Sequence, residues 1–266
     1  MGHVSVEEIL PGGVAHSGQV RRVGELVVRP SNEHSRTIHA LLRHVRLAGF
    51  TGVPEPVRIA PDGREWLTFI HGDVPLPPFP AWYRADVVLA STALLVRKYH
   101  DATQGFVPPL GANWSSELAD PLGGDIICHN DVCPENVVYR NSTAIALLDF
   151  DFAAPGRRVF DLASFARMCV PIDSDQDAAR TGRGGLNPFE RLRAIADAYG
   201  LPPDRSEFIR VIGERCEHGG AFVRRRVEAG DPAFIEMWNG MGGEERYERR
   251  KQWFESSRQR FLDTVG

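Results

Sequence analysis

Three short apolar runs near the middle of the chain constrain its fold more than any other feature. The runs "DIIC", "NVVY" and "AIALL" are separated by the polar stretches "HNDVCPE" and "RNST", and "DFD" follows them. If the turn-forming residues 140–143 close a hairpin, the returning strand brings Asp149 opposite residues 134–136. Asn136 and Asp149 then lie side by side at the strand ends, and Asp131 lies in the loop before them.

These side chains share one kind of chemistry. Two carboxylates and an amide oxygen are hard ligands that suit Mg²⁺ bound together with substrate phosphates. Asp131 is placed to orient an incoming hydroxyl and accept its proton, and His129 is placed to brace the loop by hydrogen bonds. Asp and Asn are also common turn residues, so an isolated Asp and Asn pair would need no function. The order His-x-Asp-x-x-x-x-Asn, followed after an apolar strand by a further Asp, favours a functional site.

The composition narrows the class of protein. With 266 residues, of which 42% are hydrophobic, the chain can form one large domain or two unequal lobes. A net charge of −4 argues against a dedicated nucleic-acid binder. We also expect no membrane span and no secretory signal. The four cysteines suggest free thiols in a reducing cytoplasm, and Cys128 and Cys133 lack the second ligand pair that a zinc site needs.

Residues 1–72 predict a small lobe of strands around one helix. Glycines divide the apolar runs of "LPGGVAHSGQVRRVGELVVRP", which indicates hairpins. The helical spacing of the apolar residues in "TIHALLRHV", with Gly49 after them, predicts a helix. The stretch "REWLTFIHG" predicts a strand that ends at Gly72.

Residues 73–266 predict a larger, mainly helical lobe. The prolines of "DVPLPPFPAW" stop regular structure and link the two parts. One helix is expected near residues 84–103, and another in "NPFERLRAIADAYG", where Asn187 is the N-cap and Gly200 ends the helix. The predicted class is therefore α+β, with two lobes and a cleft between them in which ligands bind.

The segments "HNDVCPEN" and "ALLDFD" resemble the catalytic and metal-binding segments of the aminoglycoside phosphotransferases, a family of kinase-like small-molecule phosphotransferases. The resemblance covers about residues 10–170. It implies a bilobal protein-kinase-like fold, with ATP or GTP as co-substrate and Mg²⁺ as the metal ion. By position, it makes Asp131 the catalytic aspartate and Asn136 and Asp149 the Mg²⁺ ligands. Asp161, in "FDLA", would support the catalytic loop.

The same resemblance places the nucleotide in the first lobe. The stretch "PGGVAHSG" fits a strand–turn–strand clamp whose backbone amides face phosphates, with Gly12 and Gly13 in the turn and Ser17 as a further donor. The stretch "LTFIHG" is similar to the hinge of the family, where adenine pairs with backbone groups, which puts Phe69 and Ile70 beside the base. Glycine pairs are also common in ordinary turns, so the first stretch alone is a weak signal.

The first lobe departs from the pattern of the family. Such enzymes pair a strand lysine with a helix glutamate, whereas the two lysines here, Lys98 and Lys251, lie elsewhere. Arg29 in "ELVVRP" is the available basic residue, and His39 lies on the helix flank where the glutamate would be. His39 is expected to accept a hydrogen bond from Arg29. Asp151 is expected to be either a further acid of the metal site or a polar strand end.

A binding protein is the main alternative to an enzyme. The missing lysine and helix glutamate suggest a kinase-like chain that binds a nucleotide or a toxin without turnover, as a resistance or immunity protein would. The Asp-x-Asp in "LLDFD" also resembles haloacid-dehalogenase-type phosphatases and nucleotide-sugar glycosyltransferases. The first class normally has this strand near the N-terminus, and the second would not explain His129, Asp131 and Asn136.

The expected partner is a small molecule that offers a hydroxyl group. The acidic runs "IDSDQD" and "GGEERYE" are candidate walls for a cationic acceptor, although a charge run more often forms a solvated face. An aminoglycoside, a choline-like amine, a sugar and another antibiotic all remain open. The choice between ATP and GTP and the oligomeric state are open as well.

Overall fold

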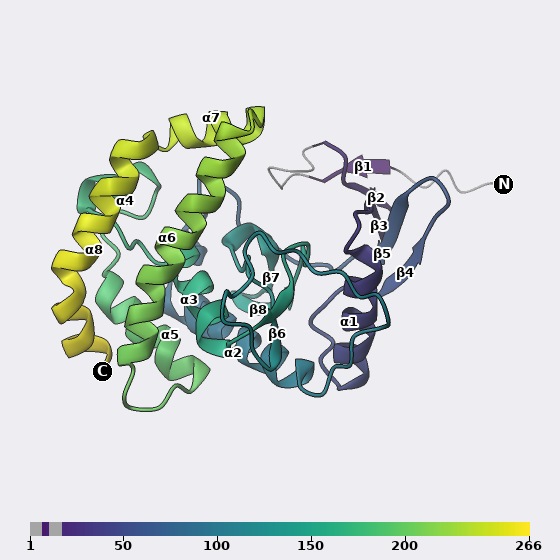
Figure 1. Ribbon diagram of the computed structural model, residues 1–266, viewed down its shortest axis with the longest axis horizontal. Helices are drawn as coiled ribbons and strands as arrows, with labels where there is room; N and C mark the ends of the chain where they lie inside the picture. Colours follow the sequence, from purple (N-terminus) through teal and green to yellow (C-terminus); the bar gives the residue numbers. More distant parts are fainter. Residues whose placement is uncertain (1–6, 11–17) are drawn as a thin grey trace.

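The structure, a computed structural model, describes residues 7–10 and 18–266. The first five strands gather with one helix at one end of the molecule, and most helices lie towards the other end (Figure 1). The strands are β1 (Glu7–Ile9), β2 (Arg21–Val23), β3 (Leu26–Pro30), β4 (Pro56–Ile59), β5 (Arg64–Thr68), β6 (Ile126–Cys128), β7 (Val137–Arg140), β8 (Thr143–Leu147) and β9 (Ala154–Gly156). The helices are α1 (Ser35–Leu47), α2 (Asp86–Thr103), α3 (Arg158–Cys169), α4 (Asp175–Arg180), α5 (Pro188–Tyr199), α6 (Ser206–Glu228), α7 (Pro232–Gly240) and α8 (Gly243–Val265), with 3₁₀ turns η1 (Ala81–Arg84) and η2 (Pro134–Asn136).

The first part of the chain forms an antiparallel sheet with the strand order β1-β2-β3-β5-β4. Strands β3 and β5 pair in a register that puts Arg29 directly opposite Glu65. The predicted helix is α1, and the apolar residues of "TIHALLRHV" are buried. Gly49 follows it with a φ of 92°, a conformation that favours glycine, so the predicted exit is confirmed.

The chain leaves the sheet earlier than predicted. The strand expected to reach Gly72 ends at Thr68, although the Phe69 N–H still donates to the Glu25 carbonyl at 2.8 Å, next to the last β3–β5 pair. The linker then passes so close to β7 that a Cβ at Gly72 would lie 2.5 Å from the carbonyl oxygen of Tyr139. The backbone of Tyr139 pairs with the residue after Gly72. The domain boundary predicted after residue 72 falls in this linker and stays a prediction.

Helix α2 lies at the centre of the helical part. It packs against α1, α5, β6 and β8, and its residues Val88, Leu95 and Tyr99 are buried. The helix begins at Asp86, two residues later than predicted, because Ala85 is extended and separates it from η1. Sheet, linker and helical part therefore meet around α2 and the β7–β8 hairpin.

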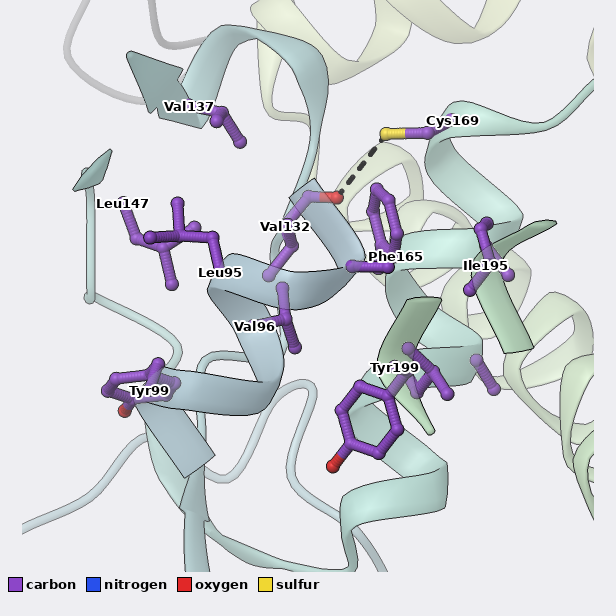
Figure 2. Close-up of a cluster of buried hydrophobic side chains, with 14 of the residues drawn as sticks. Leu95, Val96, Tyr99, Val132, Val137, Leu147, Phe165, Cys169, Ile195 and Tyr199 are labelled. Carbon is purple, nitrogen blue, oxygen red and sulfur yellow. Dashed lines mark hydrogen bonds between the residues drawn. The ribbon is translucent and has the colours of Figure 1, made fainter. Parts of the chain in front are cut away.

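A hydrophobic cluster lies beneath the loop that connects β6 and β7 (Figure 2). Val132, inside this loop, is fully buried and belongs to the same cluster as Val96 of α2 and Phe165 of α3. The thiol of Cys169 donates a long hydrogen bond, 3.8 Å, to the carbonyl of Val132. Burial of one apolar residue thus fixes the loop on which its neighbour Asp131 is presented.

The remaining helices cover this core. Helix α5 begins and ends as predicted, since the Asn187 side chain accepts the N–H groups of Phe189 and Glu190 and Gly200 follows with a φ of 82°. All four cysteines are free. Within the described ranges, no helix combines the length and the apolar character that crossing a bilayer requires.

Candidate active site

The β7–β8 hairpin forms as predicted and brings the candidate metal ligands together. Asn141 and Ser142 both have positive φ, 51° and 59°, which is the signature of a two-residue hairpin turn. The Leu148 N–H donates to the Asn136 carbonyl at 2.8 Å. Asn136 and Asp149 therefore lie at adjacent strand ends.

Asp131 lies in the loop before this hairpin and contacts Asn136. The Asn136 amide nitrogen donates to both the carbonyl and a carboxylate oxygen of Asp131, at 3.0 Å each. Burial raises the pKa of Asp131, the His129 imidazole lowers it, and the nearby Asp149 carboxylate raises it further, so that the net shift is upward. A raised pKa makes the ionised carboxylate a stronger proton acceptor.

His129 is fully buried and braces the loop with both ring nitrogens. Its Nδ1 accepts the Asp131 N–H at 3.3 Å. The proton of the neutral ring therefore lies on Nε2, which donates to the Leu148 carbonyl at 2.8 Å. These bonds connect the loop to the end of β8, the geometry that a bracing role requires.

Asp161, in the first turn of α3, fixes the same loop through backbone hydrogen bonds. Its two carboxylate oxygens accept the His129 and Asn130 N–H groups, both at 2.7 Å, and His100 donates to it at 2.8 Å. Burial would raise the pKa of Asp161, but the hydrogen bonds and charge of His100 and the His129 amide keep the pKa below its usual range. Asn130 has a φ of 66°, a strained conformation that these bonds support. His100 was not predicted as a partner of Asp161.

The basic residue of the first part of the chain reaches this site. The Arg29 guanidinium donates to Glu65 at 2.6 Å, to Asp149 at 2.9 Å and to Asp151 at 2.6 Å. Burial would lower the pKa of Arg29, but the three carboxylates raise it far above its usual value. Arg29 is therefore a permanent cation that joins the sheet to the hairpin.

The expected partner of Arg29 was wrong. His39 does not bond Arg29; its Nε2 lies 2.7 Å from the second carboxylate oxygen of Glu65. The strand register puts Glu65 opposite Arg29, and α1 brings His39 to the far side of that carboxylate. The acid that pairs with Arg29 thus comes from β5 rather than from the helix. A signal was present in "REWLT". Glu65 lies two residues before the apolar Leu67, so both side chains point to the same, buried face of the strand.

The donors fit a Mg²⁺ ion shared with nucleotide phosphates. Asn136 uses its nitrogen on Asp131, so its side-chain oxygen is the atom that would face a metal ion. Asp149 has a φ of 59° and its side chain is 35% exposed, so a strained backbone presents an accessible carboxylate. Within the described ranges, no three His, Cys, Asp or Glu side chains form a metal-binding group of their own. One amide and one carboxylate leave room for waters and phosphates, as Mg²⁺ prefers.

The acidic runs do not form an acidic wall. Asp173 and Asp177 are buried, and each pairs with an arginine of α8, Arg246 and Arg249 respectively. These ion pairs fix α8 to α4 and to the segment before it, and they neutralise charge that was expected to attract a cation. Glu244 likewise pairs with an arginine of α6.

Other predicted residues keep the status of predictions. Gly12, Gly13 and Ser17 lie outside the described residues. The Phe69 N–H is bonded to Glu25, so Ile70 offers the backbone that is left for an adenine contact.

Comparisons with known proteins agree with this geometry. Residues 110–195, which contain the loop, the hairpin and Asp161, match the sequence model of the phosphotransferase enzyme family. A trifolitoxin immunity protein of Rhizobium leguminosarum bv. trifolii is 33% identical over 187 residues, which cover 68% of this chain and 70% of the relative.

Solved structures share the fold. A choline/ethanolamine kinase family protein from Mesorhizobium loti has a TM-score of 0.65 at 19% identity and covers 99% of this chain and 93% of its own. An aminoglycoside phosphotransferase from Alicyclobacillus acidocaldarius gives 0.57 at 16%, over 92% and 91%. The GDP complex of aminoglycoside 2′-phosphotransferase-IIIa gives 0.58 at 15%, over 94% of both chains.

The fold is therefore that of the bilobal, protein-kinase-like phosphotransferases, as expected. The chain belongs to the aminoglycoside phosphotransferase family.

Proposed function

We propose that the protein transfers the γ-phosphoryl group of ATP or GTP to a hydroxyl group of a small molecule. The observation that supports this most strongly is the convergence of Asp131, Asn136 and Asp149 at one end of the β7–β8 hairpin. A loop fixed by four backbone and side-chain bonds to Asp161 and His129 presents this group. Such bonds keep reacting groups in place, which is the main contribution a protein makes to phosphoryl transfer.

The residues divide the work between the acceptor and the nucleotide. Asp131 orients the acceptor hydroxyl and takes its proton, a role typically worth ~10²–10⁴ in rate. The Asn136 oxygen and the Asp149 carboxylate would hold Mg²⁺, which when bound offsets the charge of the nucleotide phosphates. Arg29 would bind the phosphates through the end of its guanidinium, which without them bonds Asp149 and Asp151, while Glu65 retains its Nε. Ile70 contacts the base through its backbone.

A non-catalytic immunity protein is the second candidate. The relative from Rhizobium leguminosarum bv. trifolii is named for immunity to trifolitoxin, and a protein can give immunity either by modifying a toxin or by binding it. Replacement of the strand lysine by Arg29 and of the helix glutamate by His39 also favours this candidate. The arrangement of Asp131 favours the enzyme, because a protein that only binds does not need a buried carboxylate with a raised pKa.

A nucleotide-consumption screen separates the two. ATP and GTP with Mg²⁺ are offered with aminoglycosides, amino alcohols, amino acids, sugars and sugar acids, and ADP or GDP formation is measured. We expect turnover with at least one acceptor, with loss of turnover in Asp131→Asn and normal turnover in Asp175→Asn, which changes an exposed acid of α4. Tight nucleotide binding without turnover on the whole panel would instead support the immunity protein.

A further inference from the structure

Four neighbouring arginines of the helical part, two of which lie near Asp131, pair with no carboxylate within 4.0 Å among the described residues. They contrast with two neighbouring arginines of α8, Arg246 and Arg249, which bind Asp173 and Asp177. The four are Arg167 of α3, Arg183 before α5, Arg215 of α6 and Arg250 of α8. Arg215 is buried and the other three are half-buried. Unpaired guanidinium groups withdrawn from water are costly, so their accumulation here calls for an anion.

Arg215 fixes positive charge directly behind the catalytic loop. It is fully buried, and its guanidinium donates to the Leu118 carbonyl at 3.1 Å, to the Asn130 carbonyl at 3.0 Å and to the Ser164 hydroxyl at 2.6 Å. All three acceptors are neutral, so its charge is solvated by dipoles and is not cancelled. Asn130 immediately precedes Asp131, so this charge lies next to the catalytic aspartate.

Arg167 is the member whose hydrogen-bonding groups remain available. Its guanidinium lies against α6 at Gly219, where an added Cβ would be 2.2 Å from Nη2, so a glycine makes the room for it. Its Nε is buried with no hydrogen-bond partner in the part of the chain that the structure describes. Arg250 lies next to it, because the Arg250 guanidinium donates to the Arg167 carbonyl at 3.0 Å and to the Ile172 carbonyl at 2.8 Å.

The pKa values of these arginines are lowered, as expected for neighbouring cations that are withdrawn from water. Burial lowers the pKa of Arg167, and the positive charges of Arg250 and Arg215 lower it further, to about 10. Burial likewise lowers the pKa of Arg183, where Arg250 contributes, and that of Arg215. A guanidinium with a pKa of about 10 still carries its charge at pH 7, so the cluster is strongly positive. The nearby acids, Asp131, Glu135 and Asp161, carry fewer negative charges than the four guanidinium groups carry positive ones.

We propose that Arg167, supported by Arg183 and Arg250, binds an anionic group, a carboxylate or a phosphate, on the acceptor molecule whose hydroxyl group contacts Asp131. This inference rests on the proposed phosphotransfer and names its substrate class, a hydroxylated acid. A polycationic acceptor would meet like charges at this position, and the nearby acids Asp173 and Asp177 are already neutralised by Arg246 and Arg249. The γ-phosphate of the nucleotide is the other possible source of the anion, and the experiment distinguishes the two.

Acceptor pairs that differ mainly in one acidic group test the proposal. Nucleotide consumption is measured with serine against ethanolamine, homoserine against 3-aminopropanol, and D-glycerate against glycerol. We expect the acid to be the better acceptor. In Arg167→Gln the KM for the acid should rise roughly 10- to 100-fold, the loss of a charge-assisted contact, while the nucleotide KM changes less than about 2-fold.

Two further variants make this result specific. Arg167→Lys should recover part of the acceptor affinity, and Arg249→Gln, which changes an arginine of α8 that is paired with Asp177, should leave both KM values unchanged. A rise of the nucleotide KM alone in Arg167→Gln would assign the cluster to the γ-phosphate and overturn the proposal. Preference for the neutral or cationic member of each pair would also overturn it.

A binding measurement keeps the proposal testable if no acceptor is turned over. The same compounds are titrated calorimetrically into the wild type, Arg167→Gln and Arg249→Gln. If phosphotransfer fails but the anion site exists, the acids bind the wild type and Arg249→Gln and not Arg167→Gln. Equal binding of acids and neutral partners, or equal binding to all three proteins, would refute the anion site independently of turnover.

Discussion

The helical part and the sheet contribute to the same candidate site, but they differ in how far they follow the pattern of the family. On the helical side, Asp131, Asn136 and Asp149 occupy the expected places, and Asp161 holds the loop. On the sheet side, an arginine replaces the lysine, and the glutamate that binds it comes from a strand. The chemistry of phosphoryl transfer restricts the position of the reacting groups more strictly than it restricts the origin of a counter-charge.

The charge balance around Arg29 explains how the sheet side can differ from the pattern of the family. Any cation near the phosphates needs a carboxylate to fix its position, and the cross-strand place opposite Arg29 provides it through Glu65. The helix then needs only a hydrogen-bonding group, and His39 supplies it. Three carboxylates, Glu65, Asp149 and Asp151, surround a single guanidinium. The site is therefore ready for a further cation.

The largest expected effect lies on the helical side. Asp131→Asn should lower kcat by ~10²–10⁴ without lowering the thermal midpoint. Burial raises the pKa of Asp131, so its ionised form costs stability at neutral pH and a neutral amide removes that cost. Activity and thermal unfolding are measured on the same preparation. A midpoint several degrees lower would mean that Asp131 is structural.

Asp161→Asn should have the opposite profile. Asp161 has a lowered pKa, so its contribution to stability is complete above the unfolded pKa of about 4 and is lost as the pH falls through the lower folded pKa. The variant should lose roughly 2–4 kcal/mol at pH 7, and its disadvantage should shrink as the pH falls. Urea unfolding between pH 3 and pH 7 checks this. A difference that does not change with pH would contradict the assignment.

A smaller effect is expected on the sheet side. Arg29→Ala should raise the nucleotide KM roughly 10- to 100-fold, the loss of a charge-assisted contact, and more than Asp131→Asn does. Arg29→Lys should recover part of the affinity as a point charge. Initial rates at varied ATP and GTP give both constants. Equal nucleotide KM values in the two variants would remove Arg29 from the clamp.

The smallest effect belongs to His39. His39→Leu removes one hydrogen bond to Glu65 and keeps a similar volume, so the nucleotide affinity should fall by about 2- to 10-fold. The Arg29–Glu65 pair should remain. Calorimetric titration of MgATP measures the change. A loss as large as that of Arg29→Ala would show that the helix, rather than the strand, positions the arginine.

The same contrast separates what the sequence predicts from what it does not. The hairpin was predictable because its turn, Asn141 and Ser142, and its two apolar strands are neighbours in the chain. The Arg29–Glu65 pair joins residues 36 positions apart, and it depends on the register of β3 against β5. A pattern of alternating burial suggests that Glu65 points inward but does not name its partner.

The surroundings of the acceptor were the least predictable feature. The acidic runs looked like a surface for cations because their composition is local, whereas their neutralisation by Arg246 and Arg249 requires α8 to pack back on the segment before α4. The unpaired arginines come from α3, α6, α8 and a loop, which only the tertiary structure brings together. Charge in a sequence predicts a patch only when its partners are known.

A double-mutant cycle on the nucleotide affinity tests most directly whether Glu65 of β5, rather than a residue of α1, positions Arg29 for the nucleotide. The Kd of MgATP is measured for the wild type, Arg29→Ala, Glu65→Gln and the double variant, after unfolding curves confirm that each is folded. The pair predicts strong coupling: the double variant should bind no more weakly than Arg29→Ala alone, with an interaction free energy of about 1 kcal/mol or more. Additivity within about 0.3 kcal/mol would show that Glu65 does not position Arg29 for the nucleotide.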